Sequence, residues 1–147
     1  MTLQHHIDSG RFQRGFTLIE VLVAVIVLSI GLLGLAGLQA TGLKNNHSAY
    51  LRSQAVTYAY DITDRMRANR NSAIGGNYNF VAGNAIPSGS GIAQSDLAEW
   101  LTSVRNNLPG GDASVVVNGR SVVIDIQWDD SRAGGASQQH FVFNSEI

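Results

Sequence analysis

The sequence predicts an α+β fold in which one long N-terminal helix packs on a small C-terminal antiparallel β-sheet. No proline precedes Pro87, so a single helix can run from Phe16 to about residue 69. Apolar residues recur at steps of three and four in the latter half of this segment. Short β-rich runs separated by turn residues fill the C-terminal third of the chain.

Composition limits the possible functions. A chain of 147 residues has room for one modest domain with accessory segments. Its net charge of −1 provides no basic field that would attract nucleic acid. The absence of cysteine excludes thiol catalysis, thiolate metal sites and disulfides.

The first two segments differ sharply in polarity. Residues 1–15 are polar and without apolar periodicity, so we expect a leader rather than a folded element. His5 and His6 lie in this leader, where two adjacent histidines rarely make a metal site. Residues 16–43 follow as an apolar helix, and no residue from Val21 to Leu43 is charged. That uncharged run would span about 34 Å as a helix, enough for the roughly 30 Å hydrocarbon core of a bilayer.

A cleavable secretory signal is the alternative interpretation of this apolar run. Its apolar region is normally about 7–15 residues and ends in small residues, and Ala40-Thr41-Gly42 could serve as a poor cleavage site. For a membrane helix, Arg11 and Arg14 before the run and Lys44 after it favour a cytoplasmic N-terminus and an external C-terminal domain.

Three glycines, Gly31, Gly34 and Gly37, interrupt the apolar run at three-residue spacing. Each costs a helix about 1 kcal/mol relative to alanine. One interpretation is close helix packing through small residues, although the GxxxG spacing is absent. The other is a segment that loosens. The spacing alone does not decide between them.

Residues 44–70 continue the helix but become amphipathic. One face of this segment carries a stripe of apolar side chains at helical spacing. The stripe consists of Leu51, Ala55, Tyr58, Ala59, Ile62 and Met66. We expect this face to cover the apolar face of the sheet.

Residues 71–147 predict a globular domain that begins with a Gly- and Ser-rich loop to about residue 91. A short helix is expected over 95–108, capped by Ser95 or Asp96. Strands are expected over 113–117, 120–128 and 138–143. Asn118-Gly119 separates the first two strands and predicts a type I′ hairpin turn.

No catalytic, cofactor or metal motif emerges from the residue pattern, so we expect this chain not to be an enzyme. His47 and His140 are far apart in sequence. Asp125, Asp129 and Asp130 lack calcium-loop spacing and are expected to form a solvated hairpin end.

A group of arginines near the end of the long helix has two interpretations. Arg65, Arg67 and Arg70 can complement the helix dipole at its C-terminal end. The alternative is contact with a partner or with DNA.

The residues at the start of the apolar run resemble a known signal. Gly15-Phe16-Thr17-Leu18-Ile19-Glu20 follows basic residues and precedes the long apolar run, an arrangement similar to the class III signal of type IV pilins and type II secretion pseudopilins. The resemblance implies that prepilin peptidase cuts between Gly15 and Phe16, removing the 1–15 leader peptide, and N-methylates Phe16. It also implies that Glu20 pairs with the N-terminal amine of a neighbouring subunit. That would explain a carboxylate near the front of a membrane helix.

Residues 31–70 are similar to minor pilins of the pilus modification (PilV-like) family. Major pilins usually have a proline in the apolar segment and two cysteines near the C-terminus, and this chain has neither. Both departures favour a minor pilin. The glycine series of Gly31, Gly34 and Gly37 would then replace the proline as the place where the helix melts during assembly.

The resemblance implies a pilin-like fold and a role in type IV pilus assembly or initiation, with effects on adhesion, motility or DNA uptake. Implied partners are prepilin peptidase, other minor and major pilins, and the inner-membrane assembly platform. The expected location is the inner membrane, with the C-terminal domain in the periplasm, and then the pilus. Alternatives are a minor type II secretion pseudopilin and a membrane-tethered or secreted binding module or enzyme.

Overall fold

The computed structural model describes residues 15–147. Its elements are α1 (Leu18–Ala68), α2 (Arg70–Ile74), α3 (Ile92–Asn107), β1 (Asp112–Asn118), β2 (Ser121–Trp128), the 3-10 turn η1 (Ser131–Ala133) and β3 (Gln139–Glu146). The chain divides into two compact units, one ending at Ala40 and one covering Thr41–Ile147. The predicted α+β fold of a long apolar N-terminal helix and a small three-stranded antiparallel sheet is confirmed.

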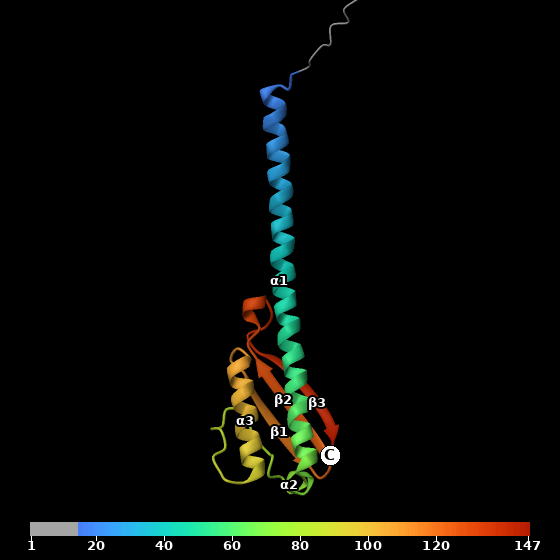
Figure 1. The fold of residues 1–147 in the computed structure, drawn as a ribbon, viewed down its shortest axis with the longest axis vertical. Helices are drawn as coiled ribbons and strands as arrows, with labels where there is room; N and C mark the ends of the chain where they lie inside the picture. The colour runs from blue at the N-terminus through green and yellow to red at the C-terminus, as the bar shows by residue number, and fades with distance from the viewer. Residues whose placement is uncertain (1–14) are drawn as a thin grey trace, which may run out of the picture. The chain divides into compact units, whose positions relative to one another are not determined.

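The second unit is built of two layers (Figure 1). The sheet has the order β1-β2-β3 with both pairs antiparallel. The latter part of α1 and the whole of α3 cover one face of this sheet, where apolar side chains are buried together. The core strands contribute Val115, Val117, Val122, Ile124, Ile126 and Trp128. The opposite face stays open, because Val116, Val123 and Val142 are exposed there.

The amphipathic stripe of α1 packs as its spacing predicts. Leu51, Ala55, Ala59, Ile62 and Met66 are all buried in the common core. The predicted member Tyr58 is only partly buried, packed against the edge of the core.

Trp100 anchors α3 to α1. Its side chain is completely buried, and its indole Nε1–H donates a 2.9 Å hydrogen bond to the backbone oxygen of Tyr58. That carbonyl belongs to the interior of α1, so the bond fixes the position of α3 along the longer helix. The burial of a tryptophan at this contact adds a large apolar area to the core.

A network of charged side chains also joins α1 to α3. Arg65 bonds to Glu99 at 3.0 Å and to Asp61 at 3.1 Å. Partial burial lowers the pKa of Arg65, but these carboxylates together raise that pKa above its ordinary value, so the guanidinium stays charged. Tyr78 donates to Asp96, and burial together with this hydrogen bond raises the pKa of Tyr78 to about 12.

Several predicted element boundaries need correction. Helix α3 begins at Ile92 after Gly91, which makes no side-chain cap, so the predicted Ser95 or Asp96 cap is wrong. The segment expected to be loop from residue 71 contains the short helix α2. Strand β3 continues to Glu146, beyond the predicted end at residue 143, because its later residues still pair with the start of β2.

The hairpin turn also differs from its prediction. Asn118 pairs with Ser121, so the two loop residues are Gly119 and Arg120. Only Gly119 has a positive φ, at 62°, whereas a type I′ turn requires positive φ at both loop residues. A positive φ at the first position alone is typical of a type II′ turn. The type I′ prediction is therefore wrong, because the strand register moves Asn118 into β1.

The segment after β2 is folded back onto α1 by Asp130. This aspartate is only 3% exposed, and its Oδ2 accepts a 2.6 Å hydrogen bond from Ser48 Oγ of α1. The prediction of a solvated hairpin end is therefore wrong for Asp130. Gly135 lies so close that a Cβ there would come within 2.5 Å of the Asp130 carboxylate. Position 135 therefore has no room for a side chain beside Asp130, which explains why it is glycine.

Asp112 connects the loop before α3 to the sheet. Its carboxylate accepts hydrogen bonds from the backbone N–H of Gly83 and of Ala113, and from Arg105 at 3.0 Å. Partial burial acts to raise the pKa of Asp112, but these donors outweigh it and lower the pKa below its usual range. The ionised carboxylate therefore stabilises the folded domain.

We expect the contribution of Asp112 to be complete above its unfolded pKa of about 3.9 and to disappear as the pH falls through the lower folded pKa. The Asp112→Asn variant should lose about 1–2 kcal/mol of unfolding free energy at pH 7. Its stability should also fall less steeply than wild type below pH 4. Urea unfolding of the full chain in detergent micelles, followed by the fluorescence of Trp100 and Trp128, measures both effects. The control is Asp64→Asn at a side chain that is 71% exposed. Equal losses in the two variants would contradict the assignment.

Candidate functional site

The start of α1 is fixed by Thr17. The backbone N–H of Glu20 donates to Thr17 Oγ1 at 3.3 Å and to the Thr17 carbonyl at 3.1 Å. Thr17 therefore acts as the N-cap of α1, and Glu20 occupies the third helical position. The sequence Thr17-Leu18-Ile19-Glu20 has the T-x-x-E form of a capping box. Our sequence analysis missed the role of Thr17, although this spacing could have revealed it.

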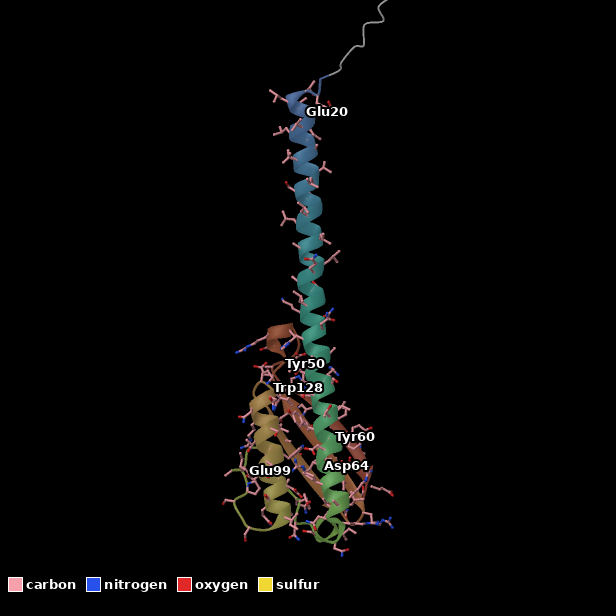
Figure 2. The ribbon with its side chains drawn as sticks, viewed as in Figure 1. Glu20, Tyr50, Tyr60, Asp64, Glu99 and Trp128 are labelled. Atoms are coloured by element: carbon pink, nitrogen blue, oxygen red, sulfur yellow. The ribbon has the colours of Figure 1, made fainter. Side chains whose placement is uncertain are left out.

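Glu20 lies in the first turn of α1, as Figure 2 shows. Its backbone N–H is capped, but its carboxylate makes no hydrogen bond or ion pair with residues 15–147. The reciprocal half of the capping box, in which the glutamate bonds back to the N-cap N–H, is thus not formed with Thr17. The helix dipole favours a negative charge at this end. The helix dipole therefore stabilises the charged carboxylate of Glu20, which can still pair with a cation outside the described residues.

The apolar half of α1 exposes its side chains on all sides. Every residue from Gly15 to Ala40 is exposed, including large apolar side chains such as Leu18, Val27 and Leu33. By length and composition α1 could cross a membrane, and none of its most apolar window is buried within the chain. A helix that is apolar all round requires lipid or other helices around it. The carboxylate of Glu20 therefore lies at the N-terminal end of a large exposed apolar surface.

The three glycines of this segment lie where an added side chain would meet open space among residues 15–147. A Cβ built at Gly31, Gly34 or Gly37 meets nothing within 4 Å. The helix nevertheless runs through all three positions without interruption. Steric crowding by residues 15–147 therefore does not require glycine at these positions. Contact with another helix and a weakened helix are the two interpretations.

The structure separates the arginines that the sequence placed together. Arg65 points to α3 through Asp96 and Glu99. Arg67 bonds to Ser145 Oγ of β3, and Arg70 bonds to the backbone oxygen of Ile147. Each guanidinium thus joins α1 or α2 to another part of the domain. The dipole interpretation misses these contacts, because they involve residues distant in sequence.

The three aspartates expected to form a solvated hairpin end have separate partners. Asp125 accepts from His140 across the β2–β3 pair at 3.1 Å, Asp129 accepts from the N–H of Ser131, and Asp130 is buried against Ser48. Within residues 15–147, no three His, Cys, Asp or Glu side chains are grouped to hold a metal ion. His5, His6, Arg11 and Arg14 lie outside the described residues.

A pocket of about 330 Å³ lies beside the α1–α3 network. It is lined by Arg65, Ala68, Asn69, Ile92 and Asp96. Its charged groups already pair with each other at 3.5 Å, so they offer little unsatisfied charge to a ligand.

Comparison with known protein families agrees with the N-terminal geometry. Residues 10–36 match the family model of the prokaryotic N-terminal methylation motif. The chain carries a prepilin signal. The matched range contains Gly15, Phe16 and Glu20, the capped helix start and most of the apolar run. No curated protein and no solved structure gave a significant match.

The signal supports a type IV pilin or pseudopilin. It implies processing by a prepilin peptidase and association with a membrane. The candidate site is therefore the helix start, Gly15 to Glu20, together with the exposed apolar surface that follows. The prepilin signal implies that a prepilin peptidase processes this helix start.

Replacing Gly31, Gly34 and Gly37 together by alanine should stabilise the apolar half of α1, because each new Cβ meets open space. The expected gain is about 1 kcal/mol of helix stability per position. Amide hydrogen exchange in detergent micelles should become slower across residues 28–41. The matched control is Ala36→Gly in the same exposed segment, which should exchange faster. Unchanged exchange in the triple variant would show that these glycines do not weaken the helix.

Proposed function

We propose that this protein is a minor pilin of a type IV pilus, anchored in the inner membrane by residues 16–43 with its C-terminal domain in the periplasm until it joins the filament or its initiating complex. The observation that carries the proposal is the combination of a capped helix start with a carboxylate that has no partner among residues 15–147. Glu20 stands in the first turn of a helix whose apolar side chains are all exposed as far as Ala40. The methylation motif covers the same residues. A PilV-like role in assembly or initiation would affect adhesion, motility or DNA uptake through the whole pilus.

The proposed mechanism pairs two charges at an apolar interface. Cleavage after Gly15 creates a positively charged N-terminal amine at Phe16. A carboxylate such as Glu20 costs about 3 kcal/mol in the centre of a bilayer by insertion scales. An amine supplied by a neighbouring subunit offsets part of that cost when both groups leave water. Since the pair forms only when the helices are correctly offset, it sets the axial register between subunits.

The exposed apolar half of α1 supplies the bulk of the proposed assembly interface. Lipid and neighbouring helices are equally apolar, so packing and specific polar contacts decide the association. The glycine series would allow the helix to loosen as a subunit leaves the membrane for the filament. Slower exchange in the alanine triple variant, accompanied by poorer incorporation into pili, would support this step.

The first test is the N-terminus of the mature protein. We expect mass spectrometry of the membrane fraction to find a chain that begins with N-methylated Phe16 when the peptidase is present. The Gly15→Trp variant should retain residues 1–15, because a bulky side chain obstructs close approach to the backbone at the cut. A mature chain that begins near Leu43 would instead show a secretory signal. A chain that retains Met1 in the presence of the peptidase would show a tethered protein of another kind.

The second test is Glu20→Gln, which keeps shape and removes charge. We expect normal cleavage after Gly15 but incorporation into sheared pili reduced at least about tenfold, because the amine of the neighbouring subunit loses its partner. The matched control is Thr17→Ser, which retains the capping oxygen and should assemble normally. Normal incorporation of Glu20→Gln would eliminate the charge-pair mechanism.

A minor pseudopilin of a type II secretion system is the second candidate, because the same motif supports it. Deletion of the gene distinguishes the two. Loss of surface pili with normal protein secretion supports the pilin, and the reverse result supports the pseudopilin.

A further inference from the structure

The two edges of the sheet are treated differently. The edge of β1 is covered by residues 79–80 of the loop after α2. Phe80 and Val115 exchange two backbone hydrogen bonds of 2.9 Å, and Asn79 Oδ1 accepts from the N–H of Val117 at 2.6 Å. Covering an edge in this way prevents pairing with another chain.

The edge of β3 has no such cover among the described residues. Gln139–Glu146 pairs with β2 in continuous register, and no other described strand pairs with its far side (Figure 1). The strand contains no proline, lysine or bulge, the devices that usually protect an edge. Alternate residues of β3 therefore point backbone N–H and C=O groups away from β2, although the Glu146 carbonyl already accepts a 3.3 Å hydrogen bond from Arg67.

Apolar side chains flank the middle of this edge on both faces. On the face toward α1, the half-exposed ring of Tyr60 lies 5.0 Å from that of Phe143, which in turn lies 6.4 Å from Phe141. On the other face, Val142 is 53% exposed. Figure 2 shows Tyr60 on the side of α1 near β3. A strand added here would find apolar neighbours for alternate side chains on both of its faces.

Arginines of α1 stand at both ends of β3. Arg52 donates to Gln139 Oε1 at 3.3 Å and makes no ion pair with the described residues. Arg67 donates to Ser145 Oγ at 3.2 Å and to the Glu146 carbonyl at 3.3 Å and pairs with Asp64, but its side chain remains 49% exposed. A guanidinium has five N–H donors, so each arginine can donate hydrogen bonds to a further carboxylate.

This charge pattern argues against a second copy of the chain as the occupant. Antiparallel pairing of two β3 strands would bring Arg52 of one copy toward Arg67 of the other, and parallel pairing would bring like arginines together. Pairing of β3 with β1 of another copy is blocked because Phe80 occupies that edge. The complementary occupant is therefore a different strand with acidic ends.

We propose that the β3 edge binds an extended segment of a partner protein by strand addition, and that this segment is apolar in its centre and carries carboxylates at both ends. Backbone hydrogen bonds to β3 supply affinity, while the Tyr60–Phe143 rings, Val142 and the two arginines supply specificity. This site lies in the unit Thr41–Ile147 and does not involve Glu20, so the proposal stands separately from the assembly mechanism.

The test uses the full chain in detergent micelles and a fluorescent peptide, Glu-Val-Thr-Val-Thr-Val-Glu. Fluorescence anisotropy should show binding at least about tenfold tighter than for the same peptide with lysine ends. Methylation of alternate backbone nitrogens in the peptide should abolish binding, because the strand bonds are lost. The Arg52→Glu/Arg67→Glu variant should prefer the lysine peptide, with circular dichroism confirming that it remains folded.

Two exposed valines provide a matched pair for locating the site. Val142 on β3 and Val116 on β1 are 53% and 54% exposed on the same open face of the sheet. Val142→Asp should weaken binding of the acidic peptide at least about tenfold, and Val116→Asp should leave it unchanged. Equal affinity for the acidic and lysine peptides, or equal effects of the two substitutions, would overturn the proposal.

Self-association gives a further decisive readout. The chain has no cysteine, so Val142→Cys introduces a single thiol. Rapid disulfide dimerisation through this thiol, blocked by neither peptide, would assign the edge to a second copy and overturn the proposal. A monomer whose thiol becomes protected from alkylation by the acidic peptide alone would support it.

Discussion

The structure depends on the packing of one stripe of α1 against the sheet. Leu51, Ala55, Ala59, Ile62 and Met66 bury almost completely, and the strands bury Ile124 and Ile126 opposite them. A three-stranded sheet with one apolar face cannot be stable without such a cover. The contacts of Trp100 and Asp130 with α1 extend the same cover to α3 and to the loop after β2.

The same helix serves two environments because its side-chain pattern changes along its length. Up to Ala40 its side chains are exposed and apolar, and from Leu51 onward one face is buried and the other polar. Apolar exposure on this scale marks a surface that is covered in the working state of a protein. The capped start at Thr17 and the free carboxylate of Glu20 mark the end of that surface. A membrane would cover this surface, as the prepilin signal implies.

Many charged side chains of the domain form ion pairs or hydrogen bonds that join separate elements. Charged side chains at the α1–α3 contact pair with each other, and Asp112 ties the loop before α3 to β1. The β1 edge is closed by Phe80, while the edge of β3 stays open between Arg52 and Arg67. Because the β1 edge is covered, a further strand could be added to the sheet only beside β3.

The sequence by itself determined the long helix, its change from apolar to amphipathic, the three strands and the signal around Glu20, because these follow from local periodicity and from a short motif. The tertiary structure alone decided that Asp130 is buried, that the arginines separate and that β3 extends to Glu146. Each of these depends on a partner distant in sequence, such as Ser48 for Asp130 or Ser121 for Glu146. Local patterns carry no information about such partners. The hairpin register shows the same limit, since pairing across strands moved Asn118 out of the turn.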